Sequence, residues 1–240
     1  MMPDTPDTVE VNQDFTHKKG LYWFLKYILL GPLVTVYNRP HFDGINNIPS
    51  DGPAILAGNH LSMADWIFTP LGSPRRIAYL AKSEYFTGTG LNGTFQRTFF
   101  AQTGQVPIDR TSANAAENAI STAKRLLNEG RLVGLYPEGT RSPDARLYRG
   151  KTGVARIALH TGTPIIPVGV VGTDKVCRPG KKEWRRHRVT VKFGEPIDPA
   201  DFGRSGDADA ERALTDHLMQ QIQALTGQQY VDEYAPRHKR

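Results

Sequence analysis

Hydrophobic positions along the chain fall into two patterns that follow one another repeatedly. Short apolar or loosely alternating runs predict β-strands at residues 54–57, 76–81, 103–110, 131–136, 164–171 and 189–193. The runs at 54–57 and 164–171 are apolar enough to predict buried strands. Longer stretches with apolar residues on one face predict helices at residues 66–71, 113–129, 153–160 and 209–225. Strands that alternate with helices are typical of α/β proteins, so we expect a layered, mixed and largely parallel sheet flanked by helices.

The most apolar stretch, residues 21–37, lies near the start of the chain. Its 17 residues are at the lower limit of the roughly 20 needed to span a bilayer. Lys26 interrupts the stretch, and Gly31 and Pro32 break its middle. Because aromatic and basic residues accompany the apolar ones, we predict that residues 17–40 form a pair of amphipathic helices on a membrane surface. A helical hairpin that covers the protein's own core and a true membrane span are the alternatives.

Charge and composition narrow the function without choosing it. The chain has 240 residues, and 30 Lys and Arg exceed 24 Asp and Glu to give a net charge of +6. This charge suits a phosphate ligand, an anionic membrane or a nucleic acid. The single Cys177 excludes an internal disulfide and a cysteine-rich zinc site, and it is compatible with a reducing cytosol. Residues 1–16 are predicted to be a flexible tail and residues 228–240 a basic C-terminal tail.

Residues 59–66, NHLSMADW, directly follow the predicted strand at 54–57. His60 is a candidate general base for a substrate hydroxyl, and Asp65 would orient the imidazole and stabilise the imidazolium. Five residues of a regular helix turn through about 500°, so the two side chains meet only if His60 is in a loop and a helix begins near Ser62. The same residues match a capping box, with Ser62 as the N-cap and Asp65 as the acidic N3 residue. Catalysis and capping are both open at this point.

Charged residues also follow other predicted strands. Lys82 stands at the end of one strand, Arg110 at the end of another, and the loop PEGTRS at residues 137–142 follows a third. Because polar residues gather at the carboxyl ends of parallel strands, we expect one cleft lined by His60, Lys82, Arg110 and the loop from Glu138 to Arg141. Each charge has a local alternative partner: Glu84 for Lys82, Asp109 for Arg110 and Glu138 for Arg141.

Four short segments occur along the chain in the order found in one known family. NHLSMAD is similar to an NHxxxxD motif, GQVPIDR (104–110) resembles a second block, YPEGTRS (136–142) a third and PIIPV (164–168) a fourth. Together they resemble the glycerolipid acyltransferases, the 1-acylglycerol-3-phosphate acyltransferase (PlsC-like) family, over about residues 40–200. In the second block Val106 and Pro107 stand where the family more usually has an aromatic residue and isoleucine.

The resemblance implies a reaction. A fatty acyl group would pass from acyl-CoA or acyl carrier protein to a hydroxyl of lysophosphatidic acid, which gives phosphatidic acid in phospholipid biosynthesis. It implies an acyltransferase domain over residues 41–227, His60 and Asp65 as catalytic residues, and no metal or cofactor. Alternatives are acylation of glycerol-3-phosphate or another lysophospholipid, hydrolysis by a thioesterase, and a non-catalytic protein that binds anionic lipid.

The resemblance also implies roles for the charged loops. Arg110, Arg141 and Lys82 would bind the phosphate of the acceptor. Glu138 would hydrogen-bond the glycerol or orient Arg141, and Thr140 lies in the same substrate-binding loop. The backbone N–H of Gly139 is a candidate donor to the developing oxyanion. The fourth block is expected to be a core strand.

The expected partners are lipids and the acyl donor. Membrane lipids, lysophosphatidic acid and acyl-CoA or acyl carrier protein follow from the resemblance, and nucleic acid does not. The basic run at residues 181–188 is either a solvated loop or a contact with anionic headgroups, with the phosphates of coenzyme A or with acyl carrier protein. We expect a peripheral or monotopic protein at the cytoplasmic face of the cell membrane.

Overall fold

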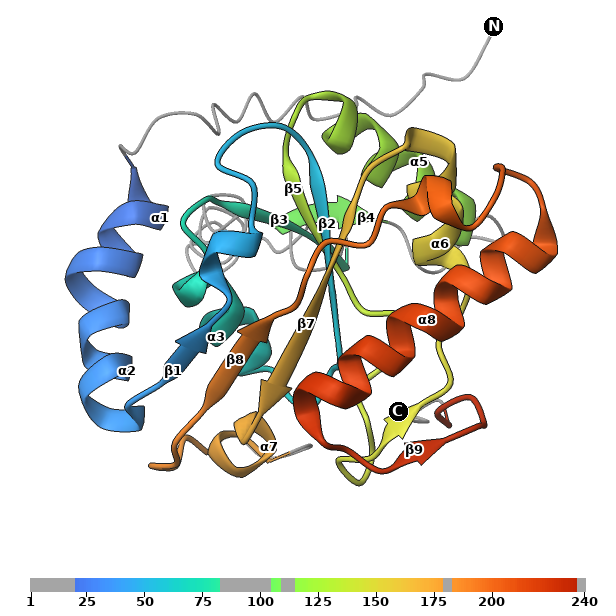
Figure 1. The fold of residues 1–240 in the computed structure, drawn as a ribbon. Helices are drawn as coiled ribbons and strands as arrows, with labels where there is room; N and C mark the ends of the chain where they lie inside the picture. Colours follow the sequence, from blue (N-terminus) through green and yellow to red (C-terminus); the bar gives the residue numbers. More distant parts are fainter. Residues whose placement is uncertain (1–19, 83–104, 109–114, 179–182, 237–240) are drawn as a thin grey trace, which may run out of the picture.

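The computed structural model describes residues 20–82, 105–108, 115–178 and 183–236 (Figure 1). Within them, seven strands form one sheet in the order β1-β8-β7-β2-β5-β3-β4. Their bounds are β1 His41–Asp43, β2 Ala54–Gly58, β3 Ile77–Lys82, β4 Gln105–Ile108, β5 Leu132–Leu135, β7 Ile165–Val171 and β8 Thr190–Phe193. Neighbouring strands are parallel except for the antiparallel pair β7–β8. The predicted mixed, largely parallel α/β sheet is confirmed.

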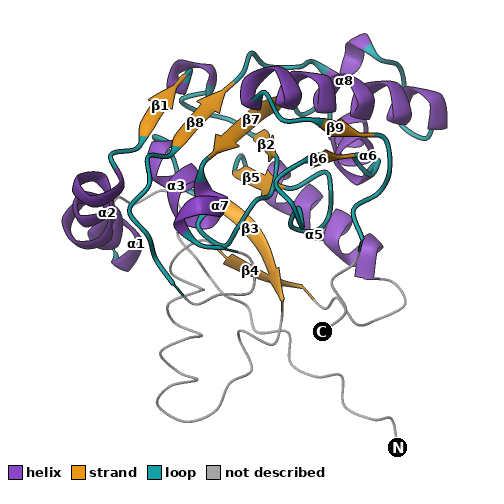
Figure 2. Cartoon of the chain, turned by 90° about the horizontal axis from the view of Figure 1, so that it is seen from below, coloured by secondary structure: helices purple, strands orange, loops and turns teal. Residues whose placement is uncertain are grey.

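Helices cover both faces of this sheet (Figure 2). Their bounds are α3 Asp65–Gly72, α5 Ala115–Asn128, α6 Gly153–Thr161, α7 Thr173–Val176 and α8 Ala208–Thr226, with 3₁₀ turns at Ile45–Asn47 and Pro199–Asp201. Strand β2 is buried along its whole length. Ile55 packs in the cluster under α5, α6 and α8, whereas Leu56 packs in the cluster under α3 and α7. A strand buried on both faces has to be apolar at every position, as the sequence of β2 is.

The C-terminal segment is more ordered than its composition predicts. The sequence pattern places Tyr230 in a basic tail, but Tyr230–Val231 is strand β9 and pairs with β6, Leu147–Tyr148, in a second small sheet. Two-residue strands carry too little hydrophobic pattern to be predicted. This pairing brings the segment after α8 alongside the segment that follows β5.

The N-terminal helical segment is one continuous run and not the predicted pair of helices. It consists of α1 Leu21–Phe24, a π-helical turn Leu25–Leu29 and α2 Leu30–Asn38. The N–H of Leu30 donates to the carbonyl oxygen of Leu25, five residues back. Pro32 has no N–H to donate, and a Cβ on Gly31 would lie 1.7 Å from the carbonyl oxygen of Lys26. The wider π turn accommodates the proline and this close approach, so Gly31 and Pro32 do not end the helix.

This helical run faces the protein with buried polar side chains beside the buried Tyr22 and Val34. Lys26 is only 9% exposed, and its Nζ donates to the carbonyl oxygen of Pro70, at 2.8 Å, and to that of Ser73. Burial lowers the pKa of Lys26 to about 8. At the other end, Nδ2 of Asn38 donates to the carbonyl oxygens of Arg185 and His187, at 3.0 Å each.

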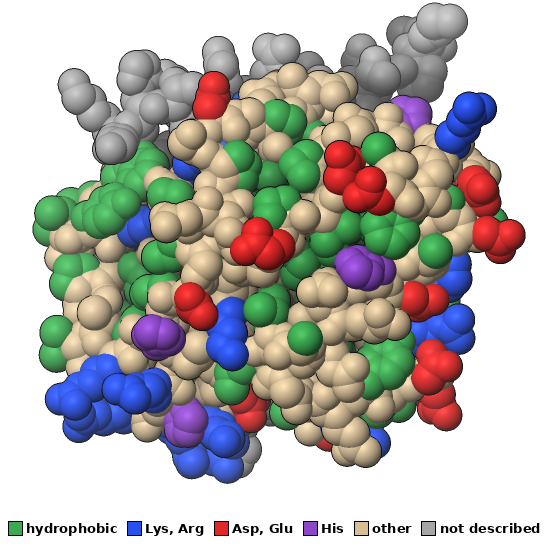
Figure 3. All heavy atoms as spheres, in the orientation of Figure 1, with side chains coloured by type: hydrophobic (Ala, Val, Ile, Leu, Met, Phe, Trp, Pro, Cys, Tyr) green, Lys and Arg blue, Asp and Glu red, His purple; other side chains and the backbone are tan. Residues whose placement is uncertain are grey.

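The opposite face of the run is apolar and exposed. Figure 3 shows hydrophobic side chains gathered over α1 and α2, above a group of Lys and Arg. The large exposed hydrophobic residues of this face are Phe24, Tyr27, Ile28, Leu29, Leu33, Val36 and Tyr37. We call these seven residues the apolar face. No helix in the described ranges is both long and apolar enough to cross a membrane.

Replacing Lys26 with alanine should loosen the run from the protein body. The change removes a cationic donor from two carbonyl oxygens at the end of α3, which costs about 1–3 kcal/mol. Amide hydrogen exchange measured by mass spectrometry should become faster in residues 21–38 and stay the same in the sheet. Leu33→Ala is the matched control, because Leu33 is 63% exposed and its side chain faces away from the protein. Exchange at the wild-type rate in Lys26→Ala would contradict the prediction.

Candidate active site

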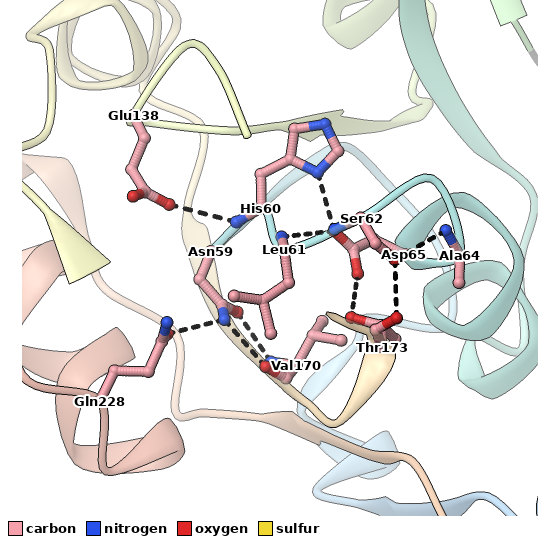
Figure 4. A network of polar contacts seen from close by, with 10 residues as sticks. All are labelled: Asn59, His60, Leu61, Ser62, Ala64, Asp65, Glu138, Val170, Thr173 and Gln228. Carbon is pink, nitrogen blue, oxygen red and sulfur yellow. Dashed lines mark hydrogen bonds and ion pairs between the residues drawn. The ribbon is translucent and has the colours of Figure 1, made fainter. Parts of the chain in front are cut away.

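The site lies where three neighbouring strands end. Strand β2 pairs in parallel with β5 on one side and with β7 on the other, so that Ala57 is level with Leu135 and Pro167. Their carboxyl ends therefore meet at the same edge of the sheet. The loop from Asn59 follows β2, the loop from Tyr136 follows β5, and Gly172 follows β7. These three connections hold all the groups drawn in Figure 4 except Gln228 and Val170.

His60 and Asp65 form a buried pair. Nδ1 of His60 lies 2.7 Å from Oδ2 of Asp65, and the side chains are 9% and 0% exposed. His60 is in a loop and α3 begins at Asp65, so the geometric condition for the pairing is met. When Nδ1–H donates to the carboxylate, the other ring nitrogen, Nε2, is an acceptor. In Figure 4 Nε2 lies on the side of the ring away from Asp65.

Asp65 also holds the loop that leads into the helix that it begins. Its Oδ2 accepts hydrogen bonds from the backbone N–H of Leu61, at 2.8 Å, and of Ser62, at 2.9 Å. Oγ of Ser62 in turn accepts from the N–H of Ala64, at 3.0 Å. The predicted capping box is not formed, because the N-cap of α3 is Ala64, whose side chain makes no capping bond, and Asp65 is the first residue of the helix. The backbone bonds from Leu61 and Ser62 instead hold Oδ2 where the imidazole needs it.

Aromatic rings enclose the imidazole. The ring of Tyr136 stacks on His60 with 3.9 Å between centroids and 10° between planes, and Trp66 lies 5.9 Å away. Burial raises the pKa of the Tyr136 phenol well above its usual value, so this ring stays neutral. The stacking fixes the plane of the imidazole without adding charge beside it.

Glu138 holds the main chain of the His60 loop. Its Oε1 accepts from the N–H of His60 at 3.2 Å, and its Oε2 accepts from the N–H of Tyr148 at 3.0 Å. The N–H of Ser142 donates to the carbonyl oxygen of His60 at 2.7 Å. Burial raises the pKa of Glu138, which is 1% exposed, to about 7. Both carboxylate oxygens are used within the protein, and the alternative ion pair with Arg141 is not formed.

The rest of this loop differs in part from expectation. The N–H of Gly139 donates to the carbonyl oxygen of Tyr136 at 3.0 Å, with φ at +73°. This bond closes a turn, so the N–H is engaged there and its expected role as an oxyanion donor is not supported. Thr140 and Arg141 are half-buried. Among the described residues no carboxylate forms an ion pair with Arg141. Burial raises the pKa of the Cys177 thiol, and the positive charge of Arg141 opposes this increase.

Two expected phosphate ligands fall outside the described structure. Lys82 ends β3, but its side chain is not among the described groups, and Arg110 lies in the undescribed range 109–114. Their alternative partners Glu84 and Asp109 lie outside it as well. In the part of the chain that the structure describes, no group of three His, Cys, Asp or Glu side chains could hold a metal ion.

Two polar residues of the site were not identified from the sequence pattern. Asn59 donates to the carbonyl oxygen of Val170 and accepts from its N–H, both at 2.8 Å, and so continues the β2–β7 pairing with its side chain. Thr173 donates through Oγ1 to Oδ1 of Asp65 at 2.5 Å. Polar residues gather at the carboxyl ends of parallel strands. Thr173 follows the predicted buried strand at 164–171, so this tendency could have identified it.

Comparison with known proteins agrees with this geometry. A family model described as Acyltransferase matches residues 39–171. A 1-acyl-sn-glycerol-3-phosphate acyltransferase of Bacillus subtilis is 31% identical over 194 residues, which cover 80% of this chain and 87% of the relative. A chloroplast enzyme of the same name from Arabidopsis thaliana is 27% identical, and the match covers 75% of this chain but only 50% of the relative.

A solved structure has the same arrangement of elements. The crystal structure of the 1-acyl-sn-glycerophosphate acyltransferase PlsC from Thermotoga maritima matches with a TM-score of 0.59 and 25% identity. The match covers 83% of this chain and 80% of that chain. With the paired His60 and Asp65 at the strand ends, these findings show that the chain belongs to the acyltransferase family that includes the 1-acyl-sn-glycerol-3-phosphate acyltransferases.

Proposed function

We propose that this acyltransferase moves a fatty acyl group from a thioester to a hydroxyl of lysophosphatidic acid, with His60 as the general base. The observation that carries the proposal is the buried pair in which Asp65 takes Nδ1 and leaves Nε2 to accept a proton. Relatives named 1-acyl-sn-glycerol-3-phosphate acyltransferases support the choice of acceptor. The donor is acyl-CoA or acyl carrier protein, and glycerol-3-phosphate or another lysophospholipid is the alternative acceptor.

The reaction then needs only groups that the site and substrates supply. Nε2 of His60 takes the proton of the acceptor hydroxyl as its oxygen attacks the thioester carbonyl carbon. Asp65 stabilises the imidazolium that forms. The tetrahedral intermediate collapses, the carbon–sulfur bond breaks, and the thiolate leaves and takes the proton from the imidazolium. The products are phosphatidic acid and a free thiol.

The acceptor's phosphate needs a cation beside this base. Arg141 lies between Glu138 and Ser142, in the loop whose hydrogen bonds hold the N–H and the carbonyl oxygen of His60. Among the described residues its guanidinium has no ion-pair partner. A planar guanidinium can hold a phosphate in two parallel hydrogen bonds. We therefore assign Arg141 to the phosphate. Lys82 and Arg110 keep their proposed roles as further ligands, and Glu138 is assigned to holding the His60 loop.

The apolar face gives this chemistry access to lipid. Acceptor, product and acyl chain are amphiphilic, and seven large apolar side chains project from the N-terminal helical run. The exposed arginines 39, 185, 186 and 188 lie beside or close to Asn38, at the end of that run. An apolar surface next to a cationic one suits the interface of a membrane with anionic lipid. A peripheral or monotopic location at the cytoplasmic face of the membrane is part of the proposal.

His60→Ala should lower the release of thiol from palmitoyl-CoA with lysophosphatidic acid by at least about 100-fold, because the general base is lost. The assay follows thiol release and phosphatidic acid together. His160→Ala is the control, since His160 is an exposed histidine on α6. Release that does not depend on an acceptor would indicate a thioesterase, and glycerol-3-phosphate in place of the lysolipid tests the alternative acceptor. If neither acyl-CoA nor acyl carrier protein supports acyl transfer, the result would indicate a non-catalytic protein that binds lipid.

Glu138 should give stability a pH dependence that Glu138→Gln lacks. The pKa of Glu138 is raised from 4.5 to about 7 in the folded state. The stability that the protonated carboxyl group contributes to the folded state is therefore fully present below pH 4.5 and is lost as the pH rises through 7. Relative to Glu138→Gln, the free energy of unfolding of the wild type should fall by roughly 3 kcal/mol over this range. Denaturant titrations at a series of pH values measure it. Glu195→Gln, at an exposed carboxyl group, is the control. Parallel pH curves for wild type and Glu138→Gln would refute the prediction.

Replacing Ile28, Leu33 and Val36 together with serine should weaken binding to lipid vesicles by at least about tenfold, because less apolar surface enters the membrane. Flotation with vesicles of zwitterionic and anionic phospholipid measures the bound fraction. Turnover of acceptor dispersed in detergent should stay near that of the wild type, since these side chains face away from the protein body. Ile45→Ser, an exposed apolar residue outside the apolar face, is the control. Unchanged flotation of the triple variant would show that another surface binds the membrane.

A further inference from the structure

The two oxygens of Asp65 have different surroundings. Oδ2 meets Nδ1 of His60 and the N–H groups of Leu61 and Ser62. Among the described residues, Oδ1 accepts from one group, Oγ1 of Thr173, at 2.5 Å (Figure 4). Asp65 and Thr173 are both completely buried. A single hydroxyl therefore satisfies the oxygen of Asp65 that His60 does not use.

Thr173 is placed by the turn that ends β7. Gly172 has φ at +91°, and a Cβ there would lie 2.6 Å from the carbonyl oxygen of Arg188, so only glycine fits. The chain turns at this glycine, and Thr173 begins the short helix α7. The carbonyl oxygen of Thr173 also accepts from Oγ of Ser62, at 3.0 Å. Thr173 thus holds the stretch from His60 to Asp65 at two points, through its hydroxyl and through its main chain.

We propose that Thr173 is a positioning residue for acyl transfer, whose hydroxyl fixes the Asp65 carboxylate so that Oδ2 faces Nδ1 of His60. A carboxylate rotates easily about its Cβ–Cγ bond, since this torsion is broad. The hydrogen bond at Oδ1 restrains that rotation, and the imidazole is then held with Nε2 toward the acceptor. The proposal rests on the proposed function of His60, and it concerns the orientation of the base and not the binding of either substrate.

Three variants separate this role from simple packing. Thr173→Val keeps the shape of the side chain and removes the hydroxyl, and Thr173→Ser keeps the hydroxyl. Thr215→Val is the matched control, because Thr215 is also completely buried and its hydroxyl donates within α8, to the carbonyl oxygen of Glu211. In Thr173→Val, kcat should fall roughly tenfold to a hundredfold, the loss expected for one hydrogen bond to a charged group. KM for acceptor and donor should change less than about twofold, and Thr173→Ser should restore most of kcat.

A second readout does not depend on turnover. The proton between Nδ1 of His60 and Asp65 should give a downfield proton NMR resonance in the wild type and in Thr215→Val, and His60→Ala should lack it. Thr173→Val should lose or shift this resonance, and Thr173→Ser should keep it. If the wild type transfers no acyl group, the proposed function fails while the resonance still tests the role of Thr173.

Three results would overturn the proposal. They are wild-type kcat in Thr173→Val, an unchanged resonance in Thr173→Val, and a kcat in Thr173→Ser as low as in Thr173→Val. If circular dichroism shows that Thr173→Val does not fold, Thr173→Ser tests the proposal by itself. Its kcat and its resonance must then both be close to those of the wild type.

Discussion

Burial of the Asp65 carboxylate is the constraint around which the site is built. A buried charge is tolerated only where hydrogen-bond donors replace water. Among the described residues Asp65 has four: the imidazole of His60, two backbone N–H groups of the loop after β2, and the hydroxyl of Thr173 after β7. These donors come together only because β2 and β7 lie side by side and end at the same edge. The sheet register is thus a condition for burying the carboxyl group that orients His60.

Two buried carboxyl groups act on His60 in different ways. Asp65 contacts the side chain of His60, whereas Glu138 contacts its backbone N–H. Glu138 has two backbone donors, and burial raises its pKa to about 7. Together with the bond from the N–H of Ser142, these contacts fix the imidazole and both adjoining peptide groups. A base held in this way needs little rearrangement to meet its substrate, which favours catalysis.

Helix α3 links this site to the N-terminal helical run that carries the apolar face. Asp65 is its first residue, and Lys26 donates to carbonyl oxygens at its other end. The N-terminal helical run therefore docks through buried polar contacts together with Tyr22 and Val34, and it leaves seven large apolar residues exposed. Cations at the C-terminal end of a helix also complement its dipole. Helix α3 thus connects the proposed membrane contact with Asp65, the residue that orients His60.

The sequence by itself determined the alternation of strands and helices, the buried strand before His60 and the condition for pairing His60 with Asp65, which is a loop before the helix. These features depend on hydrophobic periodicity and on residues five positions apart, which are local properties of the chain. The tertiary structure decided the partners of these residues. Thr173 is 108 positions from Asp65, and Glu138 is 78 positions from His60. It also decided that Gly139 closes a turn and that Lys26 points inward. Such contacts depend on which strands become neighbours and in what register, and no local pattern encodes that.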